Sequence, residues 1–266
     1  KKHVWESEEK GAVGRFSVKG LDAILDELPE KVEVFEKAYR DFGNLADATR
    51  FFVNELFADF GVIVVDGDHR DLKALYKDAV KEDIVNQRSN AAVQKTNAQI
   101  EALGYKPQIF SREINFFYLQ EQSRERIIPQ GDRYLINNTE LSFSQEELLA
   151  ELDSCPEKFS PNVVMRPLYE ETILPNLAYV GGPAEMIYWL QLKAVFDERG
   201  IAFPILLPRN FGLYVNGASV KRMKKLGLSD LDLFKSSKGI KEAYLADHAE
   251  EGVSIESEIE ALKNLY

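Results

Sequence analysis

Residues 177–185 place two glycines, a proline and a glutamate directly after a short apolar run, a spacing that could bind an anion. The run at 177–180 predicts a strand, Gly181-Gly182-Pro183 ends it, and a mostly apolar segment of helical character follows. A proline just inside a helix start, after glycine, marks an N-terminus of the kind at which α/β folds bind phosphates and carboxylates. From these residues alone the alternative, glycines that only make the turn, is somewhat favoured.

Glu185 and Tyr188 are expected on the first turns of that helix, three residues apart and on one face. Glu185 would be the third helical residue, a position at which a carboxylate often caps its own helix. A solvent-facing cap and a functional carboxylate are about equally supported for this residue.

Two charged residues follow other apolar runs and are expected at the same edge of a parallel sheet. Asp66 follows 62–65, a β-branched run typical of a strand buried on both faces, and Arg209 follows the run at 204–208. Because parallel strands end at one edge, both should converge with Gly181. A guanidinium there suits bidentate binding of a carboxylate or phosphate, which favours function for Arg209. Asp-Gly is also a common turn, so a structural role is favoured for Asp66 alone.

Asn162 and Arg166 are the polar residues of an otherwise apolar segment, and they lie four positions apart. If the segment is helical they share a face and could clamp a substrate. An Arg166 that pairs with Glu170 or Glu171 is the equally supported structural alternative.

The elements that would position these residues alternate between strand and helix patterns and predict an α/β fold with a mostly parallel sheet. Short runs between charged turns at 105–139 predict an inserted antiparallel strand meander. Helices are expected at 21–28, 47–59, 68–103 and from Ser144, and strands at 62–65, 108–110, 115–119, 133–136, 177–180, 204–207 and 211–215. The predicted parts are a core with a long protruding helix (1–104), the strand insertion (105–143), a βαβ unit completing the core (144–216) and a helical tail (217–266).

The bulk composition excludes several classes of function. A formal charge of −11 over 266 residues argues against non-specific nucleic-acid binding and against an anionic membrane surface. One cysteine, Cys155, allows no intrachain disulfide and suits a reducing cytoplasm. No apolar run approaches a membrane span, and His3, His69 and His248 have no partner at zinc-ligand spacing, so no metal site is predicted. The chain starts without Met, and we expect a piece of a longer protein.

Several motifs together resemble one known family, the bacillithiol biosynthesis cysteine-adding enzymes. They run in register along nearly the whole chain. The resemblance rests on residues 10–15 (KGAVGR), 61–66 (GVIVVD), 104–107 (GYKP), 159–169 (FSPNVVMRPLY), 174–175 (LP), 179–185 (YVGGPAE), 188–189 (YW) and 204–209 (PILLPR).

The resemblance implies a Rossmann-like core, connecting-peptide insertions and a C-terminal coiled coil that pairs subunits into a homodimer. It implies a cytoplasmic ligase that joins cysteine to glucosaminyl-malate through an amide, with ATP or ADP as the expected nucleotide. Family members are about twice this length, so part of the active site is expected outside this chain. The family's pocket maps here onto Asn162, Arg166, Gly181, Gly182, Pro183, Glu185, Tyr188 and Arg209, with Asp66 a weaker candidate and no catalytic role assigned.

Two other functions stay open. The chain could be a non-catalytic α/β scaffold whose protruding helix at 81–103 and tail mediate self-association. The loop at 235–239 (KSSKG) faintly resembles the lysine-serine loop of class I aminoacyl-tRNA synthetases, although their histidine-glycine motif is absent from this sequence. A solvated loop is the favoured interpretation of that stretch. The tail carries Ile255, Ile259, Leu262 and Leu265 at helical spacing, which predicts the start of the coiled coil.

Overall fold

The computed structural model describes residues 4–248 and residue 260, and it divides the chain into two units. The first unit runs from Lys1 to Arg209 and the second from Asn210 to Tyr266. Each unit is described by itself. The predicted coiled-coil start at 255–265 lies almost wholly outside the described residues. None of the helices in the described part is long and apolar enough to cross a membrane.

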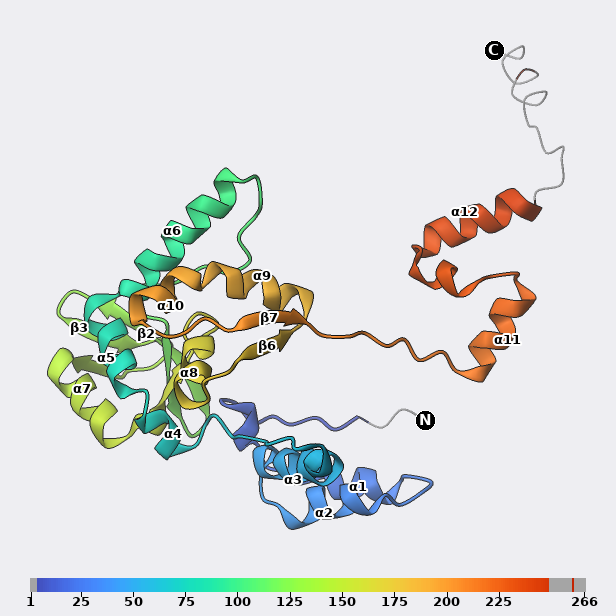
Figure 1. Cartoon of the computed structure of the whole chain (residues 1–266). Helices are drawn as coiled ribbons and strands as arrows, with labels where there is room; N and C mark the ends of the chain where they lie inside the picture. The colour runs from blue at the N-terminus through green and yellow to red at the C-terminus, as the bar shows by residue number, and fades with distance from the viewer. Residues whose placement is uncertain (1–3, 249–259, 261–266) are drawn as a thin grey trace. The chain divides into compact units, whose positions relative to one another are not determined.

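Three helices, α1 (Leu21–Asp26), α2 (Glu33–Asp41) and α3 (Leu45–Phe57), begin the first unit (Figure 1). The predicted helix at 47–59 is confirmed as α3, which Asn44 caps by accepting a hydrogen bond from the Asp47 N–H at 2.9 Å. Stacked rings of Phe35 and Phe52 join α2 to α3. Gly61, with φ of +76°, ends this region in the left-handed conformation that glycine tolerates best.

The predicted buried strand at 62–65 is wrong. The segment is extended but pairs with no strand that the structure describes, and Ile63 is 85% exposed. A β-branched run forms a sheet strand only when a neighbouring strand accepts its backbone hydrogen bonds. Asp66 therefore does not sit at the end of a strand.

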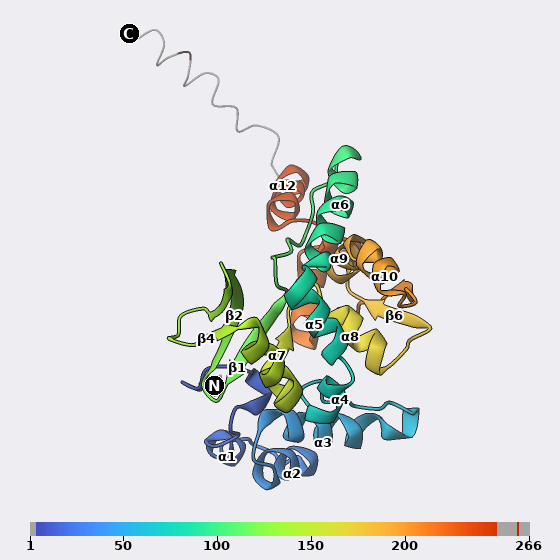
Figure 2. The same ribbon diagram turned by 90° about the vertical axis from the view of Figure 1, so that its left-hand side faces the viewer.

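The long helix predicted at 68–103 is three helices, α4 (Arg70–Ala74), α5 (Lys77–Asn86) and α6 (Arg88–Ala102). The second break falls at Gln87, which has φ of +52°. Beside this break the buried Asp83 carboxylate accepts a hydrogen bond from the Ser89 hydroxyl, a local bond that competes with continuous helix. Helix α6 packs on α9 and α10 (Figures 1 and 2).

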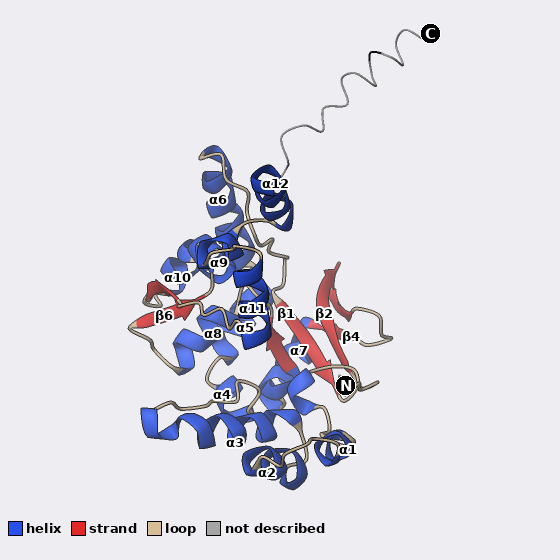
Figure 3. Ribbon diagram, turned by 90° about the vertical axis from the view of Figure 1, so that its right-hand side faces the viewer, coloured by secondary structure: helices blue, strands red, loops and turns tan. Residues whose placement is uncertain are grey.

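The prediction of a mostly parallel sheet is wrong, because the larger sheet is antiparallel. Its strand order is β4-β3-β2-β1-β5. Figure 3 shows this sheet with β1, β2 and β4 labelled. A two-residue connection between β1 and β2 permits only an antiparallel hairpin. Its strands are β1 (Phe116–Gln120), β2 (Ser123–Gln130), β3 (Arg133–Ile136), β4 (Ser142–Ser144) and β5 (Phe159–Pro161).

Parts of the predicted meander are confirmed and others are not. The runs at 115–119 and 133–136 form β1 and β3, but β2 was not predicted, because its charged sequence hides the strand pattern. The run at 108–110 forms no strand; buried Gln191 instead accepts hydrogen bonds from the Gln108 and Ile109 N–H groups. Helix α7 (Gln145–Ser154) begins with the predicted capping pair, Ser144 and Glu147.

The predicted strand–helix–strand unit is confirmed and contains the parallel pairing. Strands β6 (Ala178–Gly181) and β7 (Ile205–Pro208) form a two-stranded parallel sheet, joined through α9 (Pro183–Gln191) and α10 (Lys193–Arg199). Trp189 of α9 is fully buried and stacks on Tyr179 of β6, with ring centroids 4.1 Å apart. Helix α8 (Arg166–Ile173) precedes this unit, and its buried Leu168 joins the common core.

The second unit contains α11 (Gly217–Lys225), a short 3₁₀ segment (Asp230–Phe234) and α12 (Ser237–His248). The strand predicted at 211–215 is wrong, since these residues pair with no described strand and Phe211 is 72% exposed. The loop predicted at 235–239 instead leads into α12, where the Ser236 hydroxyl accepts a hydrogen bond from the Gly239 N–H at 3.1 Å.

Candidate functional site

A cavity of about 540 Å³ opens in the first unit, between the start of β2, the end of β5, helix α8 and the turn after residue 65. Its charged lining brings together residues that are distant in the sequence. These are Asp66, Asp68, Lys73, Arg124, Arg166 and Glu170. We refer to this cavity as the arginine pocket.

Arg124 enters the arginine pocket from β2 and is held on three sides. Its guanidinium carbon lies 3.8 Å from the centre of the Phe117 ring. Its Nε donates to the Ser160 hydroxyl at 3.2 Å and its Nη2 donates to the Pro161 carbonyl at 3.1 Å. Burial, together with the nearby charge of Arg166, lowers the pKa of Arg124, although an arginine stays protonated. The result is a rigid, partly desolvated cation.

Arg166 is the first residue of α8 and supplies a second cation to the arginine pocket. Its Nη2 donates to the Tyr188 hydroxyl at 3.1 Å. Neither Arg124 nor Arg166 lies within 4.0 Å of a carboxylate in the part of the chain that the structure describes. Two guanidinium groups without carboxylate partners in one cavity have the chemistry to bind an anion.

Asn162 holds the turn that leads into α8. Its side-chain oxygen accepts hydrogen bonds from the N–H groups of Val164 and Met165, at 2.8 and 3.3 Å. Its carbonyl accepts the Arg166 N–H at 2.9 Å. Asn162 and Arg166 therefore do not form the two arms of a helical clamp; Asn162 fixes the backbone from which Arg166 extends.

Asp68 and Lys73 of the arginine pocket belong to a compact charge cluster. The Asp68 carboxylate pairs with both Arg15 and the buried Lys73, whose ammonium also donates to the Glu157 carbonyl at 2.9 Å. Burial lowers the pKa of Lys73, and the neighbouring Asp68 opposes that shift. Burial also opposes ionisation of Asp68, yet Arg15 and Lys73 together hold the pKa of that carboxyl below its ordinary value. The cluster is satisfied internally.

Two other carboxylates face the arginine pocket, and only one of them is engaged. One oxygen of Asp66 accepts the Asp68 N–H at 2.9 Å, a bond typical of an Asp turn. The carboxylate of Glu170, one turn after Arg166 on α8, accepts no hydrogen bond from, and forms no ion pair with, any described residue. Burial, and to a lesser extent the charge of Glu171, raises the pKa of Glu170.

The turn between β6 and α9 lies beside the arginine pocket and is closed by its own side chains. The Glu185 carboxylate accepts the Gly182 N–H at 2.7 Å and lies 3.6 Å from Arg209 Nη2. The Gly182 N–H, with Arg209 adding to its effect, lowers the pKa of Glu185. Gly181 accepts the Arg209 N–H at 2.9 Å, and Pro183 is the first residue of α9. Glu185 therefore caps its own helix, as one of the two interpretations of this residue expected.

The structure brings most of the predicted site residues close together, although they lie in two adjacent places, the arginine pocket and the β6–α9 turn. Asp66 and Arg166 line the arginine pocket, and the Arg166–Tyr188 hydrogen bond connects it with α9. Glu185 and Arg209 lie together at the adjacent turn. The predicted meeting of Gly181 and Arg209 at the ends of two parallel strands is confirmed. The strand that should have brought Asp66 to that edge does not form, and the loop at 66–68 places Asp66 in the arginine pocket instead.

Sequence reasoning missed Arg124 and Lys73, and it considered Glu170 only as a structural partner of Arg166. Arg124 belongs to a strand that was not predicted, so nothing indicated its position. Lys73 follows Asp68 by five residues at a helix start, a spacing too common to be informative. Glu170 had a usable signal: it lies four residues after Arg166, on the same helical face.

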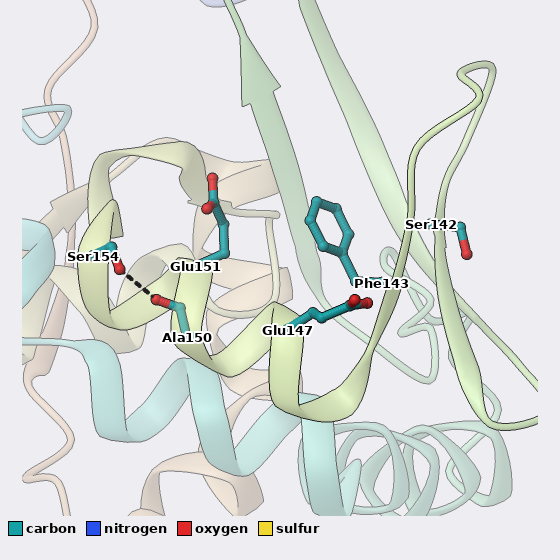
Figure 4. Close-up of a pocket in the computed structure, with 6 residues that line it drawn as sticks. All are labelled: Ser142, Phe143, Glu147, Ala150, Glu151 and Ser154. Carbon is teal, nitrogen blue, oxygen red and sulfur yellow. Dashed lines mark hydrogen bonds between the residues drawn. The ribbon is translucent and has the colours of Figure 1, made fainter.

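A second cavity, of about 460 Å³, lies at α7 and β4 and is a weaker candidate (Figure 4). Its lining includes Glu147 and Glu151 but no basic residue. Glu151 is already engaged by Lys158, at 2.6 Å, and by the Tyr118 hydroxyl, at 2.8 Å. No cluster of His, Cys, Asp and Glu able to hold a metal ion occurs among the described residues.

Comparison with known proteins identifies the family. The model of the N-terminal Rossmann-like domain of the bacillithiol biosynthesis protein BshC matches residues 1–210. Proteins named "Putative cysteine ligase BshC" are 45% identical over 250 residues in Flavobacterium johnsoniae and 40% identical over 258 residues in Cytophaga hutchinsonii. These matches cover 90% and 97% of this chain, and 47% and 49% of the relatives.

A protein of the same name from Bacillus cytotoxicus is 30% identical over 258 residues, 93% of this chain and 48% of that protein. The chain thus spans about half the length of the curated relatives it matches. The family match covers all of the first unit, including the arginine pocket and the β6–α9 turn. The chain belongs to the BshC family, and residues 1–210 are its N-terminal Rossmann-like domain.

Proposed function

We propose that this protein is a ligase of bacillithiol biosynthesis that joins the carboxyl group of cysteine to the amine of glucosaminyl-malate. The family supplies the reaction class, since its relatives are named cysteine ligases. The observation that carries the proposal is the pair of guanidinium groups in the arginine pocket, Arg124 and Arg166. Glucosaminyl-malate carries two carboxylates on its malate part, and such a dianion matches two cations that have no carboxylate of their own.

The geometry supports an orientation for this substrate. Arg124 is fixed by Phe117, Ser160 and Pro161, so it needs little reordering to bind a carboxylate. Arg166 is more exposed and is steadied by the Tyr188 hydroxyl. With the malate part at the two arginines, the amine of the sugar would lie near a carboxylate of the same cavity, since both Asp66 and Glu170 line it.

Nucleotide assistance is part of the proposal, because amide formation from a free carboxylate needs an activated acyl group. ATP or ADP is the expected nucleotide. The turn between β6 and α9 is the site we assign to its phosphates, with Arg209 as the cation. Glu185 now caps the Gly182 N–H, so a phosphate would have to displace that carboxylate to reach the backbone.

The decisive experiment incubates the full-length protein with cysteine, glucosaminyl-malate and ATP, ADP or no nucleotide, and searches for the amide product by mass. Product that requires Arg124 and Arg166 supports the proposal. Absence of product with every nucleotide, from protein that binds no glucosaminyl-malate, would contradict it. Homodimerisation through a C-terminal coiled coil also belongs to the proposal, and the oligomeric state of the full-length protein tests it.

Self-association without catalysis is the second candidate, and exposed apolar residues favour it. Leu177 is 92% exposed and Ile205 is 67% exposed, both beside the small parallel sheet. Dimerisation of the chain that depends on concentration, with no thermal stabilisation by glucosaminyl-malate or nucleotide, would support a scaffold over a ligase.

A further inference from the structure

Glu170 differs from the other carboxylates in and around the arginine pocket. Asp68 is held by Arg15 and Lys73, Asp66 accepts a backbone N–H, and Glu185 caps α9. Glu170 lines the same cavity half-buried and, among the described residues, has neither a hydrogen-bond donor nor an ion-pair partner. A partly desolvated carboxylate is costly to leave without a partner, and a bound cationic group would supply one.

Resting on the proposed function, we infer that Glu170 is the general base that binds and deprotonates the substrate amine. Its place on α8 sets the geometry. Arg166 begins the helix and Glu170 follows one turn later, so the two side chains extend from one face about 5–6 Å apart at Cβ. One helix then presents a group for the carboxylate end and a group for the amine end of the same substrate.

The step balances with a mixed anhydride of the cysteine carboxyl and a phosphate as the acyl donor. The ammonium of the sugar gives one proton to the Glu170 carboxylate, and the freed nitrogen lone pair attacks the acyl carbon. A C–N bond forms, and the C–O bond to the phosphate breaks with its electron pair on the departing oxygen. That oxygen takes the second nitrogen proton. Glu170 then releases its proton to solvent.

Other groups in the pocket are less suited to this role. Lys73 forms an ion pair with Asp68, so its nitrogen is an ammonium that has no lone pair to accept a proton. Asp66 has one oxygen committed to the turn that shapes the loop. A base that exchanges protons near neutral pH benefits from a pKa above that of an ordinary carboxyl, and burial shifts Glu170 in that direction.

The charged groups around Glu170 determine the direction in which its pKa shifts. Glu171 and Glu185 raise its pKa, and Arg166 lowers it. Asp66, Asp68, Lys73 and Arg124 line the same cavity from the other elements. Rates should therefore fall on the acid side as Glu170 becomes protonated, and a substrate carboxylate that neutralises Arg166 should move this limb to higher pH.

The test compares wild type, Glu170→Gln and Glu170→Ala in the full-length protein, with Glu146→Gln on the exposed start of α7 as the matched control. Two ligands are titrated, glucosaminyl-malate and its N-acetylated form, which lacks the ionisable amine. Turnover is followed over a range of pH. We expect wild type and the control to bind glucosaminyl-malate, which has the free amine, more tightly than its N-acetylated form. We expect Glu170→Gln to lose that preference, to lose the acid limb of kcat/KM, and to lower kcat by about 10²- to 10⁴-fold.

Formate should restore part of the activity of Glu170→Ala, because a small carboxylate can occupy the space left by the side chain. The inference is overturned if Glu170→Gln keeps both the amine preference and the acid limb. Wild-type protein that binds neither ligand would overturn the proposed function itself, and the inference with it. Normal binding and turnover in every Glu170 variant would overturn the inference alone.

Discussion

The guanidinium of Arg209 lies directly against Gly182, so that a Cβ at residue 182 would stand 2.6 Å from Arg209 Nη2. No real Cβ approaches another atom so closely, and one of the two groups must move. The backbone at Gly182 is held by β6 and α9, whereas Arg209 is an exposed side chain. A substituent at 182 would therefore displace the arginine.

Gly182→Ala should cost less than about 1 kcal/mol of folding free energy, because Arg209 can swing into solvent and loses only an exposed ion pair with Glu185. Urea unfolding of Gly182→Ala, Arg209→Ala and the double variant measures this. The double variant should be no less stable than Gly182→Ala, since the displaced group is already gone. If the losses of unfolding free energy in the two single variants add up to that of the double variant, Arg209 does not occupy the space above Gly182.

Arg124→Ala and Arg166→Ala should each weaken glucosaminyl-malate binding by about 10- to 150-fold, the loss of a charged hydrogen bond of about 1.5–3 kcal/mol. Calorimetric titration measures both. Arg126→Ala is the matched control, a residue of the same type two positions along β2 that does not line the pocket. Equal affinities for all three variants would exclude the arginine pocket as the anion site.

Asp83→Asn should gain stability relative to wild type as the pH rises. Burial raises the pKa of Asp83, with bonds from Ser89 and Asn115 opposing the shift. A raised folded-state pKa means that the protonated form stabilises the fold; this contribution is fully present below the unfolded value of about 3.9 and is lost as pH rises through the folded value. Asparagine does not titrate.

The measurement for Asp83→Asn is the free energy of unfolding at several pH values between 3.5 and 7. Ser89→Ala serves as the comparison, because it removes a donor to the carboxylate and keeps the titrating group. A difference between Asp83→Asn and wild type that does not change with pH would show that the carboxylate titrates normally.

Gln191→Leu should destabilise the protein by about 2–4 kcal/mol. The buried amide accepts from two backbone N–H groups, those of Gln108 and Ile109, and donates to Asn97 at 2.6 Å. Each buried partner left unsatisfied costs about 1–3 kcal/mol. Thermal unfolding measures the loss, with Gln94→Leu on the exposed side of α6 as control. A loss equal to that of the control would contradict the structural role of Gln191.

Local sequence patterns predicted correctly those elements that form without depending on a distant part of the chain. The apolar runs around Gly181 and before Arg209 form the parallel pair β6 and β7, and Ser144 with Glu147 caps α7 as predicted. The run at 62–65 carries an equally clear strand pattern and forms no strand. Strand formation there depends on a neighbouring strand, which the local sequence does not contain.

The site was predicted in its parts but not in its assembly. Arg166 and Asp66 were identified by residue type, but Asp66 was expected beside Gly181 and Arg209, and it lines a cavity with Arg166 instead. Arg124 reaches the pocket only because a hairpin places β2 beside β1, a long-range pairing hidden by charged residues. That the Glu170 carboxylate has no partner among the described residues could be recognised only once the partners of the other carboxylates were known.

The alignment of Gly181 with Pro208 in the parallel pair limits how this part of the protein can be rebuilt. The N–H groups of Ile205 and Arg209 donate to the carbonyls of Leu177 and Gly181, so residue 208 faces away from β6 and a proline there removes no hydrogen bond from the pair. The direction in which Arg209 leaves the sheet is thus determined by strand register. A single residue inserted within β7 would therefore turn Arg209 to the opposite face.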